Sequence, residues 1–340
     1  MRPLLSICIP SYNRPEQISD LLLSIDCEPK NIEIVVCEDQ SPQREQIRSK
    51  VELFVRESPY KVRYFENEAN LGFDGNVRRL IALAAGQFAM FMGDDDLFVP
   101  EALNRFLQFI SEHQDKKYIL RSYIAVHPGG RVEKYRYLPV TTVLPRGEET
   151  VAWLFKRSVT ISGFTISRDD ALKFATSELD GTLLYQVYLM AQVCLDHESI
   201  YCDIPVAQAV QSFRDDKPNF GNSPAEKSRY TPGTISHDNS INFTKAYFEV
   251  TEYLDKLHGT RLTSRVKIIL SKYSYPFLSI QRKHGIGPFL QYAKRLETEI
   301  DFGCTHYYFV YKWGLAIFGE KFCDRLILGI KNALGRTPNF

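Results

Sequence analysis

The sequence predicts an α/β fold of the doubly wound type, followed by a helical C-terminal extension. Short apolar segments alternate with segments of helical periodicity up to about residue 105, which is typical of parallel strands buried on both faces. No G-x-G-x-x-G turn follows the first apolar segment, so a dinucleotide-binding fold is disfavoured. Beyond about residue 237 every segment has helical character.

The first part of the chain is expected to hold four strands, at 4–10, 32–37, 61–67 and 87–92. A helix is expected after the first strand, with Asn13 as its N-cap. The second helix is expected to end near Glu57, and the third to follow a loop at 70–76. Pro100 is expected to open a fourth helix, because proline favours the first helical position.

The pattern changes from about residue 117. Antiparallel strands are expected on either side of the turn HPGG (127–130), and a further strand is expected at 199–206. Helices are expected near 148–157 and 169–195. The segment 212–233 is rich in polar residues, proline and glycine, and we interpret it as a mobile loop.

The composition excludes several classes of protein. Apolar residues make up 44% and charged residues 24% of the chain, as in an ordinary globular protein. The 42 Lys and Arg residues balance 41 Asp and Glu residues, so nothing indicates a nucleic-acid-binding protein. We expect no signal peptide and no transmembrane helix. Seven scattered cysteines without a C-x-x-C pair favour a cytoplasmic location over disulfides or structural zinc.

Polar clusters follow the predicted strands. SYNR (11–14), EDQS (38–41) and GDDD (93–96) each come directly after an apolar segment, and NLGFDGN (70–76) follows the third strand. Because the carboxyl ends of parallel strands meet at one edge of a sheet, these clusters are expected to converge in space. Open α/β sheets bind ligands at that edge.

Three consecutive aspartates at one sheet edge, with few Lys or Arg residues nearby, need a cation or protonation. Oxygen ligands favour hard ions such as Mg²⁺ or Mn²⁺, and such an ion commonly bridges a diphosphate. The alternative is a solvated acidic turn at the start of the helix that Pro100 opens. The other polar clusters at the same edge favour the metal site.

Segments 6–25, 32–42 and 64–103 resemble the amino-terminal half of family 2 GT-A glycosyltransferases. The resemblance covers about 3–105 and includes the PSYNR start, the acidic loop after the second strand, and the aspartates followed by a proline. Within that family the chain is most similar to enzymes of bacterial surface polysaccharide synthesis, such as the abequosyltransferases of O-antigen synthesis.

The resemblance implies a GT-A domain at 1–235 and a helical region at 236–340. In that domain, 1–105 would bind the nucleotide sugar and 106–235 the acceptor. It also implies sugar transfer from a nucleotide-diphosphate donor to a glycan or lipid-linked acceptor, with inversion and with Mn²⁺ or Mg²⁺ as cofactor. Two rivals stay open: a catalytically silent GT-A-like binding module, and a nucleotidyltransferase that makes sugar nucleotides. The nucleotidyltransferase should carry a glycine-rich basic loop after the first strand, where SYNRPEQ has none.

Roles for single residues follow from the resemblance. The expected nucleotide-sugar contacts are Pro10, Tyr12, Asn13, Asp39, Asn70, Gly72 and Asp94. Asp39 would accept a hydrogen bond from the base, and Gly72 could serve only to give a positive φ in its turn. Asp74 is either a helix N-cap or a ligand contact.

The register of the D-x-D element is ambiguous. Counting back from Pro100 puts the family's second aspartate at Asp95 and leaves Gly93 in the first position. We favour Asp95 as a metal ligand, with Asp94 toward the nucleotide sugar and Asp96 as a second ligand or an orienting residue.

The catalytic base is expected near the start of a helix, where Tyr185 and Gln186 occupy the family's usual place for a carboxylate. Glutamine cannot accept the proton, so Asp180 is the nearest suitable candidate. Its alternative role is as the N-cap of a helix at 181–195. Further candidate carboxylates are Glu178, Asp169 and Asp170.

Two more segments carry open interpretations. In the loop at 212–233, Arg214, Lys217 and Arg229 would either contact the diphosphate or lie in solvent. The C-terminal segment 305–336 combines aromatic and basic residues, which suits a helix at the cytoplasmic face of the inner membrane. The alternative for this segment is packing on the catalytic core or on a second copy of the chain.

Overall fold

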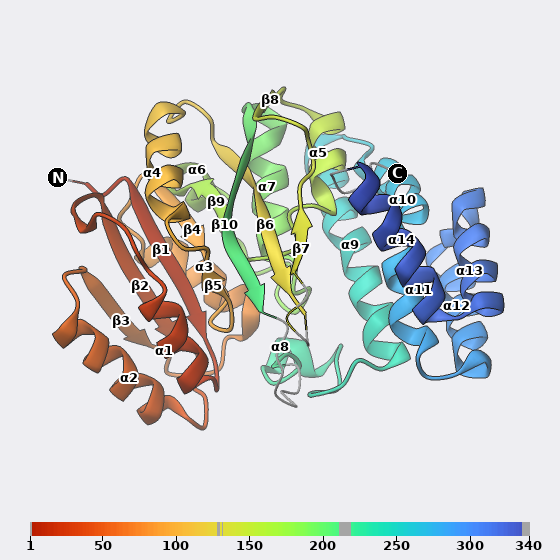
Figure 1. The fold of residues 1–340 in the computed structure, drawn as a ribbon, viewed down its shortest axis with the longest axis horizontal. Helices are drawn as coiled ribbons and strands as arrows, with labels where there is room; N and C mark the ends of the chain where they lie inside the picture. Colours follow the sequence, from red (N-terminus) through yellow and green to blue (C-terminus); the bar gives the residue numbers. More distant parts are fainter. Residues whose placement is uncertain (1, 128–129, 131, 211–218, 335–340) are drawn as a thin grey trace.

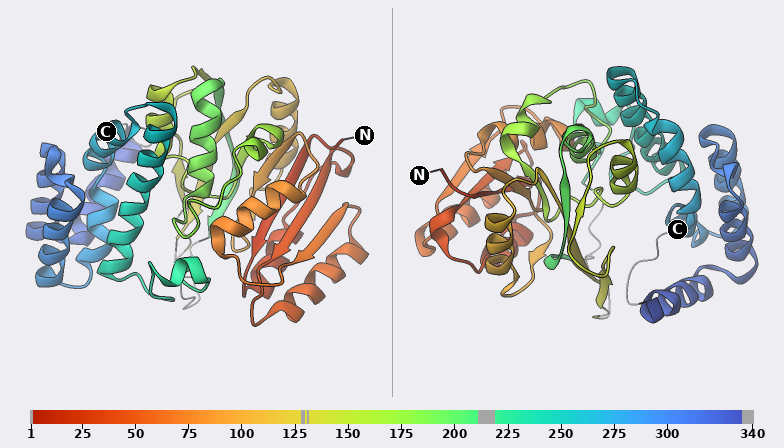
Figure 2. Two further views of the ribbon diagram at one scale, coloured as in Figure 1. Left: turned by 180° about the vertical axis from the view of Figure 1, so that it is seen from behind. Right: turned by 90° about the horizontal axis from the view of Figure 1, so that it is seen from above.

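The computed structural model describes residues 2–127, 130, 132–210 and 219–334 (Figure 1). Within these residues a mixed sheet of ten strands has the order β3-β2-β1-β4-β9-β6-β10-β5, with β7 paired to β6 and β8 to β10. Helices cover both faces of the sheet, and the helices α9 to α14 lie on the side of β7 and α5 (Figures 1 and 2).

The strands are β1 (Leu5–Ser11), β2 (Ile32–Glu38), β3 (Val62–Glu66), β4 (Phe88–Phe91), β5 (Leu97–Phe98), β6 (Tyr118–Val126), β7 (Val132–Tyr135), β8 (Thr142–Leu144), β9 (Phe164–Ser167) and β10 (Ser199–Val210). The α-helices are α1 (Pro15–Leu23), α2 (Arg44–Glu57), α3 (Gly72–Leu83), α4 (Ala102–Glu112), α5 (Glu148–Phe155), α6 (Arg168–Lys173), α7 (Tyr185–Asp196), α8 (Pro224–Lys227), α9 (His237–His258), α10 (Leu262–Lys272), α11 (Tyr275–Arg282), α12 (Ile286–Ile300), α13 (His306–Phe318) and α14 (Glu320–Leu334).

The strands of the first part are confirmed. β1 pairs in parallel with β2 and β4, and β2 pairs in parallel with β3. Every residue of β2 is buried, and Cys8 and Cys37 lie in the core as small apolar side chains. The antiparallel pair expected after residue 117 is present as β6 and β7. The sheet becomes mixed beyond β4, because β9 lies antiparallel between β4 and β6.

Three helix starts differ from the expectation. Asn13 is not the N-cap of α1: it has a left-handed backbone (φ 59°), and the helix begins at Pro15. α3 begins at Gly72, inside the segment expected to be a loop, because its first turn is held by side chains from elsewhere in the chain. α4 begins at Ala102 rather than at Pro100.

The expected helix at 169–195 is two helices, α6 and α7. The chain between them turns through left-handed conformations at Gly181 (φ 88°) and Leu183 (φ 62°), which no α-helix accommodates. In the segment 212–233, only 219–233 lies within the described residues. That part is not simply a loop, because it contains α8, whose N-terminus is capped reciprocally by Ser223 and Glu226.

The helical C-terminal region packs against the sheet-containing part through a continuous hydrophobic cluster. The rings of Phe155 on α5 and Tyr247 on α9 lie 6.1 Å apart, and those of Tyr188 on α7 and Tyr253 on α9 lie 5.9 Å apart. In the described part of the chain, no helix combines the length and apolar character that a membrane crossing requires. The expected domain boundary at 235 stays a prediction.

Candidate active site

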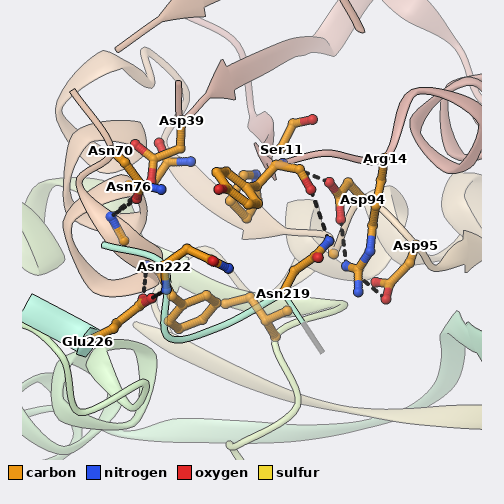
Figure 3. Close-up of a pocket in the computed structure, with 16 residues that line it drawn as sticks. Ser11, Arg14, Asp39, Asn70, Asn76, Asp94, Asp95, Asn219, Asn222 and Glu226 are labelled. Carbon is orange, nitrogen blue, oxygen red and sulfur yellow. Dashed lines mark hydrogen bonds and ion pairs between the residues drawn. The ribbon is translucent and has the colours of Figure 1, made fainter. Parts of the chain in front are cut away.

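A pocket of about 160 Å³ lies at the carboxyl ends of β1, β2 and β4 (Figure 3). The polar clusters that follow these strands meet there, as the topology predicts. The predicted nucleotide-sugar and metal residues that line it are Pro10, Tyr12, Asp39, Asn70, Gly72, Asp94 and Asp95. Three predicted residues, Asn13, Asp96 and Asp180, do not line it.

The other lining residues are Ser11, Arg14, Phe73, Asn76, Gly93, Ile161, Asn219, Asn222 and Glu226. Five of these, Ser11, Arg14, Phe73, Asn76 and Gly93, belong to the polar clusters, but no ligand contact was predicted for them individually. Glu226 was missed although a signal was present: Ser223 and Glu226 form an S-x-x-E capping pattern inside the presumed loop.

Asp39 fixes the start of α3. Its carboxylate accepts hydrogen bonds from the backbone N–H groups of Leu71 and Gly72, both at 2.8 Å, and from the side-chain amide of Asn67 at 2.7 Å. Burial raises the pKa of Asp39, although these hydrogen bonds favour its charged form. The predicted contact between Asp39 and a nucleobase stays a prediction.

Gly72 allows a second segment to approach α3 closely. Its φ is +74°, as expected for its turn, and a Cβ atom there would lie 2.4 Å from the Oγ atom of Ser223. Glu226 accepts a hydrogen bond from the backbone N–H of Phe73 at 2.8 Å. The segment 219–227 therefore closes one side of the pocket, from Glu226 beside α3 to Asn219 on the side of Arg14 (Figure 3).

Arg14 lies between two aspartates at the other end of the pocket (Figure 3). Its Nη1 atom is 2.9 Å from Oδ1 of Asp94 and 2.9 Å from Oδ2 of Asp95. Burial raises the pKa of Asp94 to about 6, and Arg14 acts in the opposite direction. The expectation that these carboxylates have few basic neighbours is therefore wrong at Arg14. Asp95 is the more exposed of the two, with 37% of its side chain accessible.

Asp96 does not line the pocket, and its carboxylate links the segment before β9 to the end of β10. Its carboxylate accepts hydrogen bonds from the hydroxyl of Ser162 at 2.5 Å and from the backbone N–H of Val210 at 2.9 Å. The same hydroxyl accepts a hydrogen bond from the N–H of Gly93 at 2.9 Å. Burial and the neighbouring Asp95 raise the pKa of Asp96 to about 7. These contacts are those of an orienting residue, and metal ligation by Asp96 stays a prediction.

Asp74 holds the start of α7 rather than its own helix. Its buried carboxylate accepts hydrogen bonds from the backbone N–H groups of Gly181 (2.9 Å), Leu183 (2.8 Å) and Tyr185 (3.0 Å). Burial raises the pKa of Asp74 to about 7, against the effect of the hydrogen bonds. The expected role of Asp74 as a helix N-cap is wrong for its own helix, because Asp74 lies inside α3 and instead caps α7, more than a hundred residues away in the sequence.

Asp180 forms an ion pair with Arg78, which donates to both carboxylate oxygens, one of them at 2.8 Å. It is not the N-cap of α7, because that helix begins at Tyr185. Gln186 is buried and donates a hydrogen bond to the carbonyl of Val159 at 2.7 Å. The role of Asp180 as the base stays a prediction.

The other carboxylates suggested as bases lie elsewhere. Asp169 pairs with Arg2 at 2.7 Å, and Asp170 pairs with Lys173 at 2.6 Å. Glu178 is exposed. Of the basic loop residues, Arg214 and Lys217 fall outside the described residues, and Arg229 pairs with Glu249 on α9 at 2.6 Å.

Residues 6–175, half of the chain, match the family model described as glycosyl transferase family 2. The chain belongs to glycosyltransferase family 2. It is 28% identical over 113 residues to the abequosyltransferase RfbV of Salmonella typhimurium, which is 33% of this chain and 34% of that protein. It is 27% identical over 184 residues to the amylovoran biosynthesis glycosyltransferase AmsB of Erwinia amylovora, which is 51% of this chain and 58% of that protein. The chain thus matches only about a third to three fifths of these relatives' length.

Solved structures identify the fold of this family 2 glycosyltransferase as GT-A. TarS 1–349 of S. aureus, in complex with UDP-GlcNAc, aligns with a TM-score of 0.56 at 17% identity, over 96% of this chain and 92% of that one. The mannosyltransferase PcManGT of Pyrobaculum calidifontis, in complex with GDP-Man and Mn²⁺, aligns with a TM-score of 0.53 at 13% identity, over 98% and 88%. The GT-A domain carries a helical C-terminal region, as the sequence predicts.

The donor set of the family 2 pocket fits a hard divalent ion held by Asp95. The Asp95 carboxylate is accessible from the pocket, whereas both oxygens of Asp96 already accept hydrogen bonds. Among the described residues, no three His, Cys, Asp or Glu side chains are grouped as a metal cage. Diphosphate oxygens and water would therefore supply the remaining ligands. The buried hydroxyl of Ser11, which lines the pocket, has no hydrogen-bond partner among the described residues and is suited to a polar ligand.

Proposed function

We propose that this protein transfers a sugar from a nucleoside-diphosphate donor to a glycan or lipid-linked acceptor in bacterial surface polysaccharide synthesis. One observation carries the proposal. A single pocket lies at the sheet edge that binds ligands in α/β folds, with Asp39 and Asn70 at one end and Asp94 and Asp95 at the other. The similarity to RfbV and AmsB supports the polysaccharide context.

In this mechanism the nucleoside lies toward Asp39 and Asn70, and the diphosphate lies toward Arg14 and Asp95. A divalent ion, Mn²⁺ or Mg²⁺, would be held by Asp95 and would stabilise charge on the leaving diphosphate. Arg14 adds a positive charge at the same end. Its guanidinium is held in place there, because it lies 2.9 Å from both Asp94 and Asp95. Direct displacement at the anomeric carbon inverts its configuration.

The experiment that tests the proposal is a thermal-shift screen of UDP-, GDP-, CDP- and dTDP-sugars, each with and without Mn²⁺. A donor that binds the folded state is expected to raise the melting temperature in a Mn²⁺-dependent manner, because ligand binding stabilises by mass action. Turnover of that donor is then followed by release of the nucleoside diphosphate. Donor binding without any turnover would favour the second candidate, a catalytically silent module, which the buried amide of Gln186 in the usual place of the base also favours.

We propose Asp180 as the base that deprotonates the acceptor. Asp180→Asn is then expected to lower kcat for transfer by about 10²–10⁴-fold with little change in donor affinity. Arg78→Gln is the matched control, because it breaks the same ion pair but leaves the carboxylate in place. Comparable losses of kcat and melting temperature in the two variants would assign the pair a structural role only.

The location and the domain division are part of the proposal. We propose that 1–235 is the catalytic domain and that 236–340 brings it to the cytoplasmic face of the membrane. α13 and α14 expose apolar side chains, among them Trp313, Ile317 and Phe322, each more than half accessible. Sedimentation with anionic vesicles that is unchanged by the triple replacement of these residues with serine would contradict the membrane contact. In that case, packing on a second copy of the chain is the remaining interpretation.

A further inference from the structure

A second, larger cavity of about 540 Å³ lies between the GT-A domain and the C-terminal helices. β6 and β7 form one side, and α9, α11, α12 and Tyr273 form the other. Its volume falls within the usual range of small-molecule sites. No residue of this cavity has a role in the donor pocket.

The two cavities share walls. Thr160 lines the large cavity, and the next residue, Ile161, lines the donor pocket. In the same way, Phe220 lines the large cavity between Asn219 and Asn222, which line the donor pocket. Adjacent α-carbons are about 3.8 Å apart, so one layer of chain separates the cavities.

The shared wall lies at the aspartate end of the donor pocket. Ile161 precedes Ser162, whose hydroxyl bonds to both Gly93 and Asp96. Asn219 donates a hydrogen bond to the carbonyl of Tyr12 at 3.1 Å, and it lies on the Arg14 side of the pocket in Figure 3. A molecule held in the large cavity thus has its nearer end beside the place where the donor's sugar–phosphate bond is expected.

The lining chemistry favours a carbohydrate over a lipid chain. Six tyrosines and three phenylalanines line the cavity, so most of its rings carry a hydroxyl. Aromatic faces stack on the C–H faces of sugar rings, and hydroxyls bond to sugar oxygens. Thr160 adds a further hydroxyl to the lining, whereas the amide of Asn239 already bonds to Thr231 and Thr234. Lys156 lies 3.8 Å above the ring of Tyr273 and brings a further donor to this wall.

We propose that this tyrosine-lined cavity binds the acceptor glycan. The reacting end of the glycan would pass over the edge of the wall formed by Thr160–Ile161 and Asn219–Phe220 to meet the donor sugar. The inference rests on the proposed glycosyl transfer. It gives the C-terminal helices a part in acceptor recognition, because Tyr247, Tyr273 and Phe277 belong to that region.

The test compares Tyr273→Ala and Phe277→Ala with Tyr253→Ala, which removes a half-buried tyrosine of the same helical region that lines neither cavity. Two probes are used: an array of bacterial surface oligosaccharides, and farnesyl diphosphate as the lipid probe. Binding to the array is measured in the presence of Mn²⁺ and the nucleotide found in the donor screen. The wild type and Tyr253→Ala are expected to bind a subset of the oligosaccharides. The two cavity variants are expected to bind that subset roughly tenfold more weakly or worse. Tyr273→Phe, which keeps the ring, is expected to restore most of the binding.

Donor binding separates this inference from the proposed function. The cavity variants are expected to keep the wild-type thermal shift with donor and Mn²⁺, since they do not touch the donor pocket. Three results would overturn the acceptor inference while donor turnover remains. They are equal oligosaccharide binding in all variants, no oligosaccharide binding by the wild type, and binding of farnesyl diphosphate alone. If no nucleotide sugar raises the melting temperature of the wild type and none is turned over, the proposed function itself is overturned.

Discussion

Replacing Asp95 with asparagine is expected to lower donor turnover by about 100-fold or more and to abolish its dependence on Mn²⁺. Asp95 is the accessible carboxylate at the end of the pocket where we propose that the diphosphate lies. Asparagine keeps the shape of the side chain but removes the negative charge that a hard cation requires. The measurement is nucleoside diphosphate release over a Mn²⁺ titration, with the melting temperature of each variant recorded beside it.

The matched control for this variant is Asp20→Asn on α1, an exposed aspartate outside the pocket. It is expected to retain wild-type turnover. Asp95→Asn is expected to fold, because the Asp95 side chain is 37% accessible and an asparagine oxygen can still accept a hydrogen bond from Arg14. If the folded Asp95→Asn protein retains Mn²⁺-dependent turnover, the metal is not held at Asp95.

Replacing Asp74 with alanine is expected to lower the free energy of unfolding by about 3 kcal/mol or more. The change leaves three backbone N–H groups at the start of α7, those of Gly181, Leu183 and Tyr185, without their acceptor. α7 is buried along almost its whole length, so water cannot easily replace that acceptor. The measurement is urea denaturation, with the exposed Asp26→Ala as the control. A loss below about 1 kcal/mol would contradict the assigned role.

The same residue gives stability a defined pH dependence. Burial raises the pKa of Asp74 to about 7 in the folded state, above the ordinary value of 3.8. The folded protein therefore binds this proton more tightly than the unfolded chain does. The resulting stabilisation is fully present below about pH 4 and is lost as the pH rises through about 7. The difference in unfolding free energy between wild type and Asp74→Asn is thus expected to fall between pH 4 and pH 8, by a few kcal/mol at ~1.4 kcal/mol per pKa unit.

Local patterns in the sequence predict the strands and the shared edge well. The apolar runs around Cys8 and Cys37 predict buried strands. Parallel pairing of these strands then brings together the polar clusters that follow them. Seven of the predicted nucleotide-sugar and metal residues accordingly line one pocket. Chain order and periodicity are sufficient for this part, because each strand and each polar cluster is contained in a few consecutive residues.

Long-range contacts explain what local patterns cannot predict. α7 starts at Tyr185 because Asp74, from α3, caps it, and nothing near Tyr185 in the sequence signals this. Asp180 resembles a local N-cap, but it pairs with Arg78, which is distant in the sequence. Arg14 is three residues past the end of β1, and only the fold places it between two aspartates.

The segment 219–227 has a consequence for how the site is assembled. The region that matches the family model ends at residue 175, whereas Asn219, Asn222 and Glu226 complete the donor pocket. During synthesis, at roughly 5–20 residues per second, the sheet edge can therefore form seconds before its last wall leaves the ribosome. A chain stopped at residue 175 would carry the aspartates but not an enclosed site. The proposed nucleotide-sugar pocket is thus complete only once the chain has been made to about residue 227, well past the region that matches the family model.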